Sequence, residues 1–374
     1  MSFESVNVAI VHDVLVQPAG GERVVLAFAK AFPGAPIYTS IYEPSEAFPE
    51  FKSLDVRTSP LTHVPAFRRH HRWAFPLMAW AFSRMAIDAD VVLCSSAGWA
   101  HGAGVEGQAR KIVYCHTPAR WLYQTERYTS DVSFAWRMAI AAGRRRLVAW
   151  DVRAAKSADR YLVNSRVVRE RVRQRYGFDA EVVPPPISLL PAGNEVPVEG
   201  LEPGYALCVS RLLAYKNVRQ IADAMRMLSS QRLVIVGTGP DQQRIASGAP
   251  DNVRLLGNVG DAELRWLYRN CGFVVAAAYE DFGLVPVEAA SFGKPVAALR
   301  WGGYMDSVAE GVTGVYFDEP TAPAIADGVR RLMTTQWDSD AIQAYATANF
   351  SERAFIERIR HIVSEEWAIK TASA

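Results

Sequence analysis

The stretch "AYEDFGLVPVEAASFGKPV", residues 278–296, joins two short apolar runs at residues 272–280 and 295–301. Pro286 suits the first turn of a helix, so the stretch predicts a strand, a loop, a helix and a second strand in succession. Strands separated by helices in this way pair in parallel. In such sheets ligands bind beyond the carboxyl ends of the strands, so the residues that follow each apolar run are candidates for a functional site.

The same alternation of short apolar runs and helical stretches recurs along the chain. Six strands are predicted in the first half and six in the second, at residues 6–13, 36–42, 54–59, 89–96, 111–117 and 159–165, and at 205–211, 231–239, 252–259, 272–280, 295–301 and 314–318. The proline cluster "VVPPPIS", residues 182–188, can neither continue a helix nor donate to a sheet ladder, so we place a hinge there. A chain of 374 residues, half of them hydrophobic, is too long for one ordinary core. We therefore predict an α/β protein with two Rossmann-like domains, residues 1–183 and 187–354, that face each other across a cleft.

The cysteines and the N-terminus bear on the cellular compartment. Cys94, Cys115, Cys208 and Cys271 are widely spaced, form no CxxC pair and lie in apolar runs, which is typical of buried thiols in a reducing cytoplasm. The N-terminal stretch has no basic segment followed by a long apolar one, and no run approaches the roughly 20 apolar residues of a membrane span. We expect a cytoplasmic protein that is neither secreted nor integral to a membrane.

Positive charge is concentrated in one part of the chain. The net charge is +2, but residues 60–175 contain twenty Lys and Arg against eight Asp and Glu, which suggests an anionic partner, either nucleic acid or a lipid surface. Within this region, segments 67–82 and 134–150 combine arginines with tryptophans and carry no acidic residue, which predicts docking on an anionic membrane surface. The alternative is two core-facing helices with solvated cationic faces. The residues concerned are Trp73, Trp80, Trp136, Trp150, Arg144, Arg145 and Arg146.

Two glycines follow the first predicted strand. Gly20 and Gly21 precede a helical stretch that begins near Glu22. Paired glycines let backbone N–H groups approach a ligand closely, and the helix N-terminus behind them favours an anion such as a diphosphate. A tight turn without a ligand is the alternative interpretation.

Histidines stand at the tips of two strands in the first half. His116 ends the fifth predicted strand, in a polar cluster with Thr117 and Arg120 that suggests a role in the cleft rather than a structural one. His12 and Asp13, at the tip of the first strand, form a second candidate pair, a catalytic base and its orienting partner.

Cations and glycines follow the first two strands of the second half. Arg211 and Lys216 can converge on a diphosphate, the first as a planar fork and the second as a mobile point charge. A pair of surface cations is the alternative. Gly237 and Gly239 flank a turn before a helix that starts near Pro240, which suits backbone contact with a nucleotide.

The opening stretch carries two glutamates around its predicted loop, residues 281–285. Glu280 ends the strand, and Glu288 lies about one helical turn beyond the loop. Carboxylates accept hydrogen bonds from hydroxyls, so we assign Glu280 to sugar hydroxyls and Glu288 to a ribose. Two acids favoured by the helix dipole are the alternative.

Taken together, these residues resemble family 4 of the retaining glycosyltransferases, which have the GT-B fold. The resemblance covers nearly the whole chain and is carried by the E-x7-E spacing of Glu280 and Glu288, by Arg211 and Lys216 in "SRLLAYKN", by "AGGER", and by "GGYMDSVAEGVTG" at residues 302–314. Asp306 stands where the family pattern usually has glutamate. The segments "VHDVLVQPAGGERVV", "APIYTSIY" and "YCHTPARWLY" look most like bacterial enzymes that add mannose to lipid-linked oligosaccharides for exopolysaccharide or O-antigen.

This resemblance implies GDP-mannose as the donor, a polyprenyl-diphosphate-linked glycan as the acceptor, and a place on the inner face of the plasma membrane. It implies transfer with retention through an oxocarbenium-like transition state. It also implies that a C-terminal helix, about residues 355–374, packs on the first domain. The implied catalytic residues are Glu280, His116, Arg211 and Lys216, and the implied acceptor residues are His116, Arg120 and His12. The implied donor residues are Gly20, Gly21, Arg211, Lys216, Gly237, Phe282, Gly283, Leu284 and Glu288.

We expect no metal or other cofactor. An Asp-x-Asp occurs at Asp88 and Asp90, but it begins an apolar run and so lies at the end of the sheet opposite the cleft, where we interpret it as a solvated strand entry. Competing functions are a sugar-nucleotide epimerase or phosphorylase on the same fold, or a transferase that uses a UDP-sugar. A nucleic-acid-binding protein is a further alternative, although the sequence contains no recognition motif for it.

Overall fold

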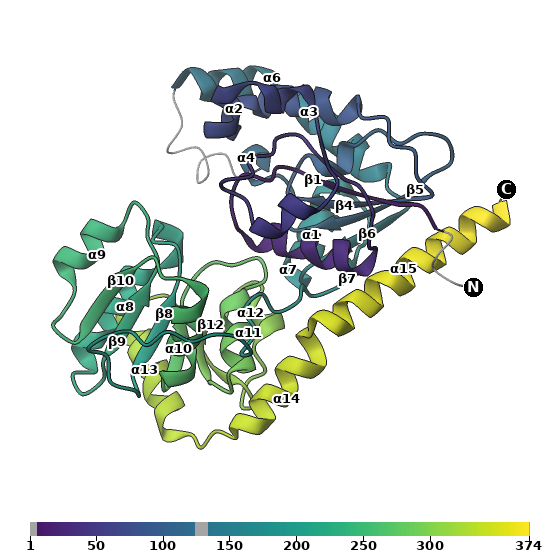
Figure 1. Ribbon diagram of the computed structural model, residues 1–374. Helices are drawn as coiled ribbons and strands as arrows, with labels where there is room; N and C mark the ends of the chain where they lie inside the picture. The colour runs from purple at the N-terminus through teal and green to yellow at the C-terminus, as the bar shows by residue number, and fades with distance from the viewer. Residues whose placement is uncertain (1–5, 124–133, 374) are drawn as a thin grey trace. The chain divides into compact units, whose positions relative to one another are not determined.

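The computed structural model describes residues 6–123 and 134–373, which form two compact units (Figure 1). The first unit contains the chain up to Pro186 together with the C-terminal helix from Glu352, and the second contains Ile187–Ser351. Each unit is built on a parallel sheet with helices packed on it. The predicted fold class, an α/β protein with two Rossmann-like domains, is confirmed.

The sheet of the first unit has seven parallel strands in the order β3-β2-β1-β4-β5-β6-β7. Their bounds are β1 Val8–His12, β2 Ile37–Thr39, β3 Val56–Thr58, β4 Val91–Ser96, β5 Arg110–Cys115, β6 Arg160–Val163 and β7 Glu181–Val182. All six strands predicted for this half are present. Strand β7 was not predicted, because two residues show no periodicity and the prolines that follow soon after cannot extend the ladder.

Alternate residues of the first-unit strands enter two separate clusters of buried side chains, so both faces of the sheet are covered. On β1, for example, Ile10 belongs to one cluster and Val11 to the other. The covering helices are α1 Gly20–Ala31, α2 Pro65–Arg69, α3 Phe75–Ser83, α4 Arg120–Tyr123, α6 Phe134–Lys156, α7 Arg166–Tyr176 and α15 Glu352–Ser373, with short 3₁₀ turns η2 Pro49–Ser53, η3 Pro60–His63, η4 His71–Ala74 and η5 Ala100–Gly102.

The C-terminal helix α15 packs along α1 (Figure 1). Phe355 stacks on Phe28 of α1, with ring centroids 5.9 Å apart. Further along the helix, Glu366 accepts hydrogen bonds of 3.0 and 2.6 Å from the guanidinium of Arg110 on β5. Lys370 donates to the carboxylate of Asp90 at 2.6 Å. These contacts attach the last turn of the chain to the first sheet.

The sheet of the second unit has six parallel strands in the order β10-β9-β8-β11-β12-β13. Their bounds are β8 Ala206–Val209, β9 Leu233–Val236, β10 Val253–Gly257, β11 Phe273–Ala276, β12 Val296–Leu299 and β13 Gly314–Phe317, and all six were predicted. The helices are α8 Val218–Ala224, α9 Gln242–Gly248, α10 Asp261–Asn270, α11 Leu284–Ser291, α12 Tyr304–Ser307, α13 Ala322–Thr334 and α14 Ser339–Phe350, with 3₁₀ turns η6 Ala214–Lys216 and η7 Met225–Met227. Because β8 lies between β9 and β11, the chain changes direction across the sheet at this point, and ligand sites form at such switch points.

The burial of the four cysteines agrees with the sequence prediction. Cys94, Cys115, Cys208 and Cys271 are all free and buried. Burial raises the pKa of Cys94, Cys208 and Cys271 to about 12, so these thiols are poor nucleophiles at neutral pH. Within residues 6–123 and 134–373, no helix combines the length and apolar character needed to cross a bilayer.

Candidate functional site

A cavity of about 310 Å³ opens at the carboxyl ends of β8, β9, β10 and β11 in the second unit. Its walls are mostly apolar side chains and backbone, with two cations and one carboxylate among them. The polar and glycine residues that line it include Ser210, Arg211, Lys216, Gly237, Asn258, Glu280, Gly283 and Tyr304. The structure therefore brings together, in one cavity, most of the donor residues predicted for this half.

Lys216 and Glu280 form an ion pair in this cavity. Asn217 adopts a left-handed conformation with a φ of 54°, which ends η6 and turns the chain into α8. Its side-chain amide donates to the Ala277 carbonyl at 2.8 Å, which ties the loop after β8 to the end of β11. This tether places the largely buried Lys216 ammonium against the partly exposed Glu280 carboxylate.

Arg211 lines the same cavity but is differently placed. It is exposed, and its guanidinium makes no ion pair or hydrogen bond with any residue that the structure describes. A guanidinium in this position can engage an incoming anion without first breaking a protein contact.

The turn after β9 depends on two glycines with positive φ. A Cβ at Gly237, where φ is +128°, would overlap the Ser210 carbonyl oxygen, and one at Gly239 would overlap that of Leu212. The turn can therefore approach the loop after β8 closely only because these two residues are glycine. This close packing forms one wall of the cavity.

The loop after β11 interlocks with the "GGY" turn that precedes α12. A Cβ at Gly283, where φ is +86°, would overlap the Tyr304 ring, and a Cβ at Gly303 would overlap the Phe282 backbone. The Gly303 amide donates to the Glu280 carbonyl at 3.0 Å. Strand β11 ends at Ala276 and helix α11 begins at Leu284, so the loop spans residues 277–283 rather than the predicted 281–285. Glu280 therefore lies within the loop and not, as predicted, at the end of the strand.

Two predicted donor residues lie elsewhere. The ring of Phe282 is buried and packs on Phe350, with centroids 5.8 Å apart, rather than lining the cavity. Glu288 is also buried and absent from the cavity wall, and it accepts hydrogen bonds from Tyr268 at 3.0 Å and from Ser188. Burial and the neighbouring Glu288 raise the pKa of Tyr268 well above its usual value. The assignment of Glu288 to a ribose stays a prediction.

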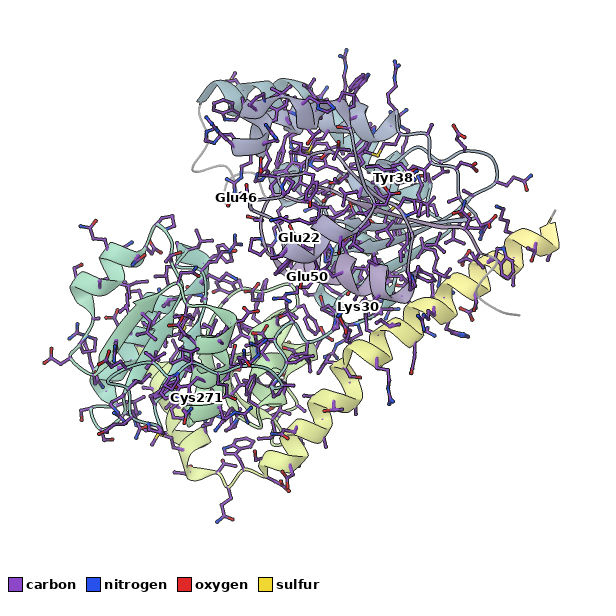
Figure 2. All side chains as sticks on the ribbon, viewed as in Figure 1. Glu22, Lys30, Tyr38, Glu46, Glu50 and Cys271 are labelled. Atoms are coloured by element: carbon purple, nitrogen blue, oxygen red, sulfur yellow. The ribbon has the colours of Figure 1, made fainter. Side chains whose placement is uncertain are left out.

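In the first unit, the ends of β1, β4 and β5 bring His12 and His116 together. Ser95 lies between them, with His12 Nδ1 at 3.0 Å from its hydroxyl and 3.1 Å from its carbonyl, and His116 Nε2 at 2.8 Å from the hydroxyl. The His12 Nε2 is 3.9 Å from the carboxylate of Glu22 at the start of α1, where Figure 2 labels this residue. Neither Ser95 nor the contact of Glu22 with His12 was predicted from the sequence.

Two details of the first-unit prediction are corrected. Gly20 and Gly21 do not precede the helix but form its first turn, because α1 begins at Gly20. Asp13 is not the orienting partner of His12: its carboxylate accepts hydrogen bonds of 2.6–3.1 Å from the backbone amides of residues 97, 99 and 100. Asp13 thus anchors the loop after β4, and the hydrogen-bond partner of His12 is Ser95. Arg120 is the first residue of α4 and is partly buried.

The two segments predicted to dock on a membrane lie on neighbouring helices, because α3 packs against α6 (Figure 1). Trp73 and Trp80 are 59% and 51% exposed. Trp150 was wrongly grouped with them: it packs on Trp99 and donates its indole N–H to Ser83 at 2.9 Å. Arg144, Arg145 and Arg146 are exposed on α6, whereas the side chain of Trp136 lies outside the described residues.

The end of the first-unit sheet where β4 begins lies opposite the end that carries His12 and His116. Asp88 is exposed and Asp90 pairs with Lys370 at the start of β4, as expected for a strand entry.

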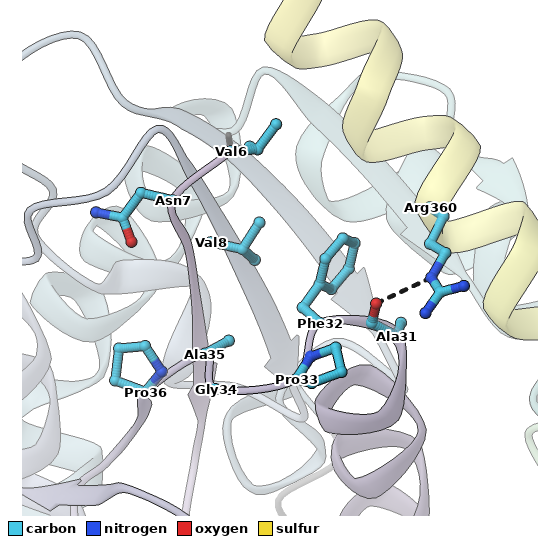
Figure 3. Close-up of a pocket in the computed structure, with 10 residues that line it drawn as sticks. All are labelled: Val6, Asn7, Val8, Ala31, Phe32, Pro33, Gly34, Ala35, Pro36 and Arg360. Carbon is cyan, nitrogen blue, oxygen red and sulfur yellow. Dashed lines mark hydrogen bonds between the residues drawn. The ribbon is translucent and has the colours of Figure 1, made fainter. Parts of the chain in front are cut away.

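A second cavity, of about 460 Å³, lies beside the start of β1 and the end of α1, where Arg360 donates to the Ala31 carbonyl at 2.9 Å (Figure 3). Within residues 6–123 and 134–373, no three His, Cys, Asp or Glu side chains are grouped in a way that could hold a metal ion.

Two family models match the chain, "Glycosyltransferase Family 4" over residues 18–189 and "Glycosyl transferases group 1" over residues 195–349. Each unit therefore belongs to a glycosyltransferase domain family. The fold is GT-B: the chain superposes on Anabaena HepE in complex with UDP-glucose with a TM-score of 0.65, at 17% identity, over 96% of this chain and 99% of that one. Sucrose-phosphate synthase from Thermosynechococcus elongatus gives 0.66 at 18% identity, over 96% and 100%.

Curated relatives align over shorter segments. A D-inositol 3-phosphate glycosyltransferase of Segniliparus rotundus is 31% identical over 185 residues, which cover 43% of this chain and 41% of the relative. A GDP-mannose-dependent alpha-mannosyltransferase of Corynebacterium glutamicum is 33% identical over 126 residues, which cover 32% and 30%. The chain thus spans less than half the length of these relatives.

Replacing Gly283 by alanine tests how tightly the loop after β11 is packed. Gly311 is the matched control, because its φ of +78° is nearly the same and a Cβ there would meet nothing within 4 Å. Gly311→Ala should cost about 1–2 kcal/mol of unfolding free energy from the left-handed backbone alone. Gly283→Ala should cost about 1–3 kcal/mol more because of the overlap with Tyr304. Denaturant unfolding of both variants measures this difference, and equal losses would show that the loop is not constrained by Tyr304.

Proposed function

We propose that the protein is a retaining glycosyltransferase that moves a sugar from a nucleotide-sugar donor, bound in the second-unit cavity, to an acceptor bound by the first unit. The observation that carries the proposal is the Arg211, Lys216 and Glu280 arrangement in a cavity lined by glycine turns. Two cations can stabilise a departing diphosphate, and a carboxylate beside them can accept hydrogen bonds from sugar hydroxyls.

The charges in the cavity favour an anionic leaving group. Lys216 is paired with Glu280 when no ligand is bound, so its largely buried charge is not left uncompensated. Arg211 remains exposed and supplies the first contact to a phosphate. As negative charge develops on the diphosphate in the transition state, Lys216 can share its hydrogen bonds between Glu280 and the phosphate oxygens, without any reaction step by the carboxylate.

GDP-mannose is the proposed donor, in line with the names of the mannosyltransferase relatives from Corynebacterium glutamicum and Dictyostelium discoideum. A UDP-sugar is the second candidate, since HepE was solved in complex with UDP-glucose. The proposed acceptor is a polyprenyl-diphosphate-linked glycan of bacterial surface polysaccharide synthesis, with His12, His116 and Arg120 on the acceptor side. No metal ion or cofactor is assigned a role.

Thermal-shift measurements with GDP- and UDP-sugars test the donor, because a ligand that binds the folded state raises the melting temperature. Incubation of the best donor with a lipid-linked acceptor, followed by NMR of the product, tests the reaction. Transfer with a retained anomeric configuration supports the proposal. An inverted product excludes the retaining mechanism, and a change in the sugar nucleotide without acceptor indicates the epimerase alternative.

Arg211→Ala and Lys216→Ala should each lower turnover by about 10²- to 10³-fold, because each removes a charged donor to the leaving diphosphate. Arg219→Ala is the matched control, since Arg219 is an exposed cation three residues further on that pairs with Asp223 outside this cavity. Rates with saturating donor and acceptor measure the effect. Near-normal turnover in both site variants would remove these cations from the mechanism.

We further propose that the first unit docks on anionic lipid through the exposed side of α3 and α6, where an acceptor with a membrane-embedded tail would be found. Leu77 and Trp80 are exposed on α3 and Trp73 on the preceding turn η4, and the exposed arginines 144–146 lie on α6, which packs against α3. Exposed tryptophans favour the membrane interface, and arginines favour anionic headgroups.

Replacing Arg144, Arg145 and Arg146 by serine should release the protein from anionic vesicles at moderate salt, since each basic residue near the surface contributes about 1 kcal/mol. Replacing Arg226, Arg330 and Arg353 by serine changes the net charge equally at exposed sites elsewhere and should leave binding unchanged. Co-sedimentation with neutral and anionic vesicles is the measurement. Equal binding of the native protein to both vesicle types, or to neither, would contradict electrostatic docking.

A further inference from the structure

The His12, Ser95 and His116 cluster is built by the sheet itself. His12 and Ser95 are register partners on the adjacent strands β1 and β4. The His116 amide donates to the Ser96 carbonyl at 2.8 Å, and the His116 carbonyl accepts from the Asn164 amide at 3.0 Å. The backbone that carries the three side chains is therefore held by hydrogen bonds on neighbouring strands, which gives the cluster a defined geometry.

The contacts of Ser95 determine which nitrogen of His12 carries a proton. The Ser95 carbonyl can only accept a hydrogen bond, and it lies 3.1 Å from His12 Nδ1. Nδ1 of His12 therefore carries hydrogen and donates to the carbonyl and to the hydroxyl oxygen of Ser95, which is 3.0 Å away.

The direction of the next hydrogen bond follows from the first. The Ser95 hydroxyl can accept from His12 and still donate its single hydrogen, and His116 Nε2, 2.8 Å away, is the acceptor that lies next to this buried hydroxyl. A nitrogen that accepts this hydrogen bond carries no proton, so a neutral His116 has its proton on Nδ1. The two ring nitrogens of a histidine are distinct in this way whenever a partner fixes one of them.

Glu22 stabilises the protonated form of His12, the first residue in the hydrogen-bonded series His12, Ser95 and His116. Burial alone would lower the pKa of the His12 ring, but the Glu22 carboxylate, together with Asp13 and the Ser95 carbonyl, raises it overall. The raised pKa favours the protonated imidazolium of His12, whose Nδ1–H donates a charge-assisted hydrogen bond to Ser95. The Glu22 side chain is itself buried, so its interaction with His12 is weakly screened by solvent.

Gly21 leaves room for both rings beside the first turn of α1. A Cβ at this position would lie 3.4 Å from His12 and 3.5 Å from His116 Nε2. These are ordinary contact distances, so the glycine is not needed to avoid a collision. It keeps the space next to the two histidines open at the N-terminus of a helix.

We propose that Ser95 is a positioning residue that fixes His116 in the Nδ1–H tautomer, with Glu22 and His12 directing the Ser95 hydroxyl. This inference rests on the proposed function only for its consequence: His116 then acts as a hydrogen-bond donor to a substrate oxygen through Nδ1, and not as a base through Nε2. A base at this site would need Nε2 to exchange its Ser95 contact for a proton.

The tautomer can be measured without any substrate. In the full-length protein labelled with ¹⁵N-histidine, the His116 signals are assigned by their loss in His116→Gln. The expected result is an unprotonated Nε2 and a protonated Nδ1. Ser95→Ala removes the donor and should shift His116 toward the Nε2–H form. A native His116 with its proton on Nε2, or an unchanged tautomer in Ser95→Ala, would overturn the proposal.

Ser96→Ala is the matched control. Ser96 is equally buried on the same strand, but its hydroxyl contacts His101 at 3.1 Å instead of His116. It should leave the His116 signals unchanged. A shift as large as that of Ser95→Ala would mean that the tautomer responds to general loosening of β4, which would also overturn the proposal.

Kinetics separate this inference from the proposed function. If the native protein transfers sugar, Ser95→Ala should lower kcat by about 3- to 10-fold, as expected for one neutral hydrogen bond, and Ser95→Thr, which retains the hydroxyl, should recover part of the rate. An unchanged kcat together with an altered tautomer would overturn the donor role of His116. If no sugar nucleotide supports transfer while the tautomer responds to Ser95→Ala, the proposed function fails and the positioning role stands.

Discussion

Parallel strand pairing is the constraint on which both candidate sites depend. All strands of a parallel sheet run in one direction, so the residues that follow them meet at one edge however far apart they lie in the chain. In the first unit this brings His12, Ser95 and His116 within hydrogen-bond distance. In the second unit it places Arg211, Lys216 and Glu280 around one cavity. The chemistry of each site is therefore set by strand order first and by the local loops second.

Both sites keep buried charge paired, and this determines how they can respond to a ligand. An isolated buried charge costs several kcal/mol, so Lys216 beside Glu280 and Glu22 beside His12 are tolerated mainly because each has a partner. Arg211 needs no such partner, because it is exposed to water. A diphosphate that enters the cavity thus meets one hydrated cation and one cation already held in position, and little reorganisation is required before the reaction.

The fold was predictable because strand runs and glycine turns are local signals. All twelve predicted strands are present, and only the two-residue β7 was missed. The site was predictable where a residue lies in the loop that follows a strand, as with Arg211, Lys216 and Glu280. It was not predictable where a side chain is turned by its three-dimensional surroundings: Phe282 packs on Phe350, and Asp13 binds the loop after β4 instead of His12. Trp150 is a third example, because the arginines near it in the sequence do not indicate that its indole packs on Trp99.

The end of β4 shows why sequence proximity is a poor guide to partners. Ser95 and Ser96 are neighbours, but alternate residues of a strand point to opposite faces. Ser95 contacts His12 and His116, whereas Ser96 contacts His101, whose Nε2 lies 3.1 Å from the buried carboxylate of Asp151 on α6. One strand end therefore supports the candidate site on one face. On the other face it supports a buried contact between His101 and Asp151, a residue of the helix that carries the exposed arginines. Substituting Ser95 changes the contacts of His12 and His116, whereas substituting Ser96 changes the contact of His101. The side chains on the two faces of β4 can therefore be substituted separately while the backbone hydrogen bonds between β1, β4 and β5 stay the same.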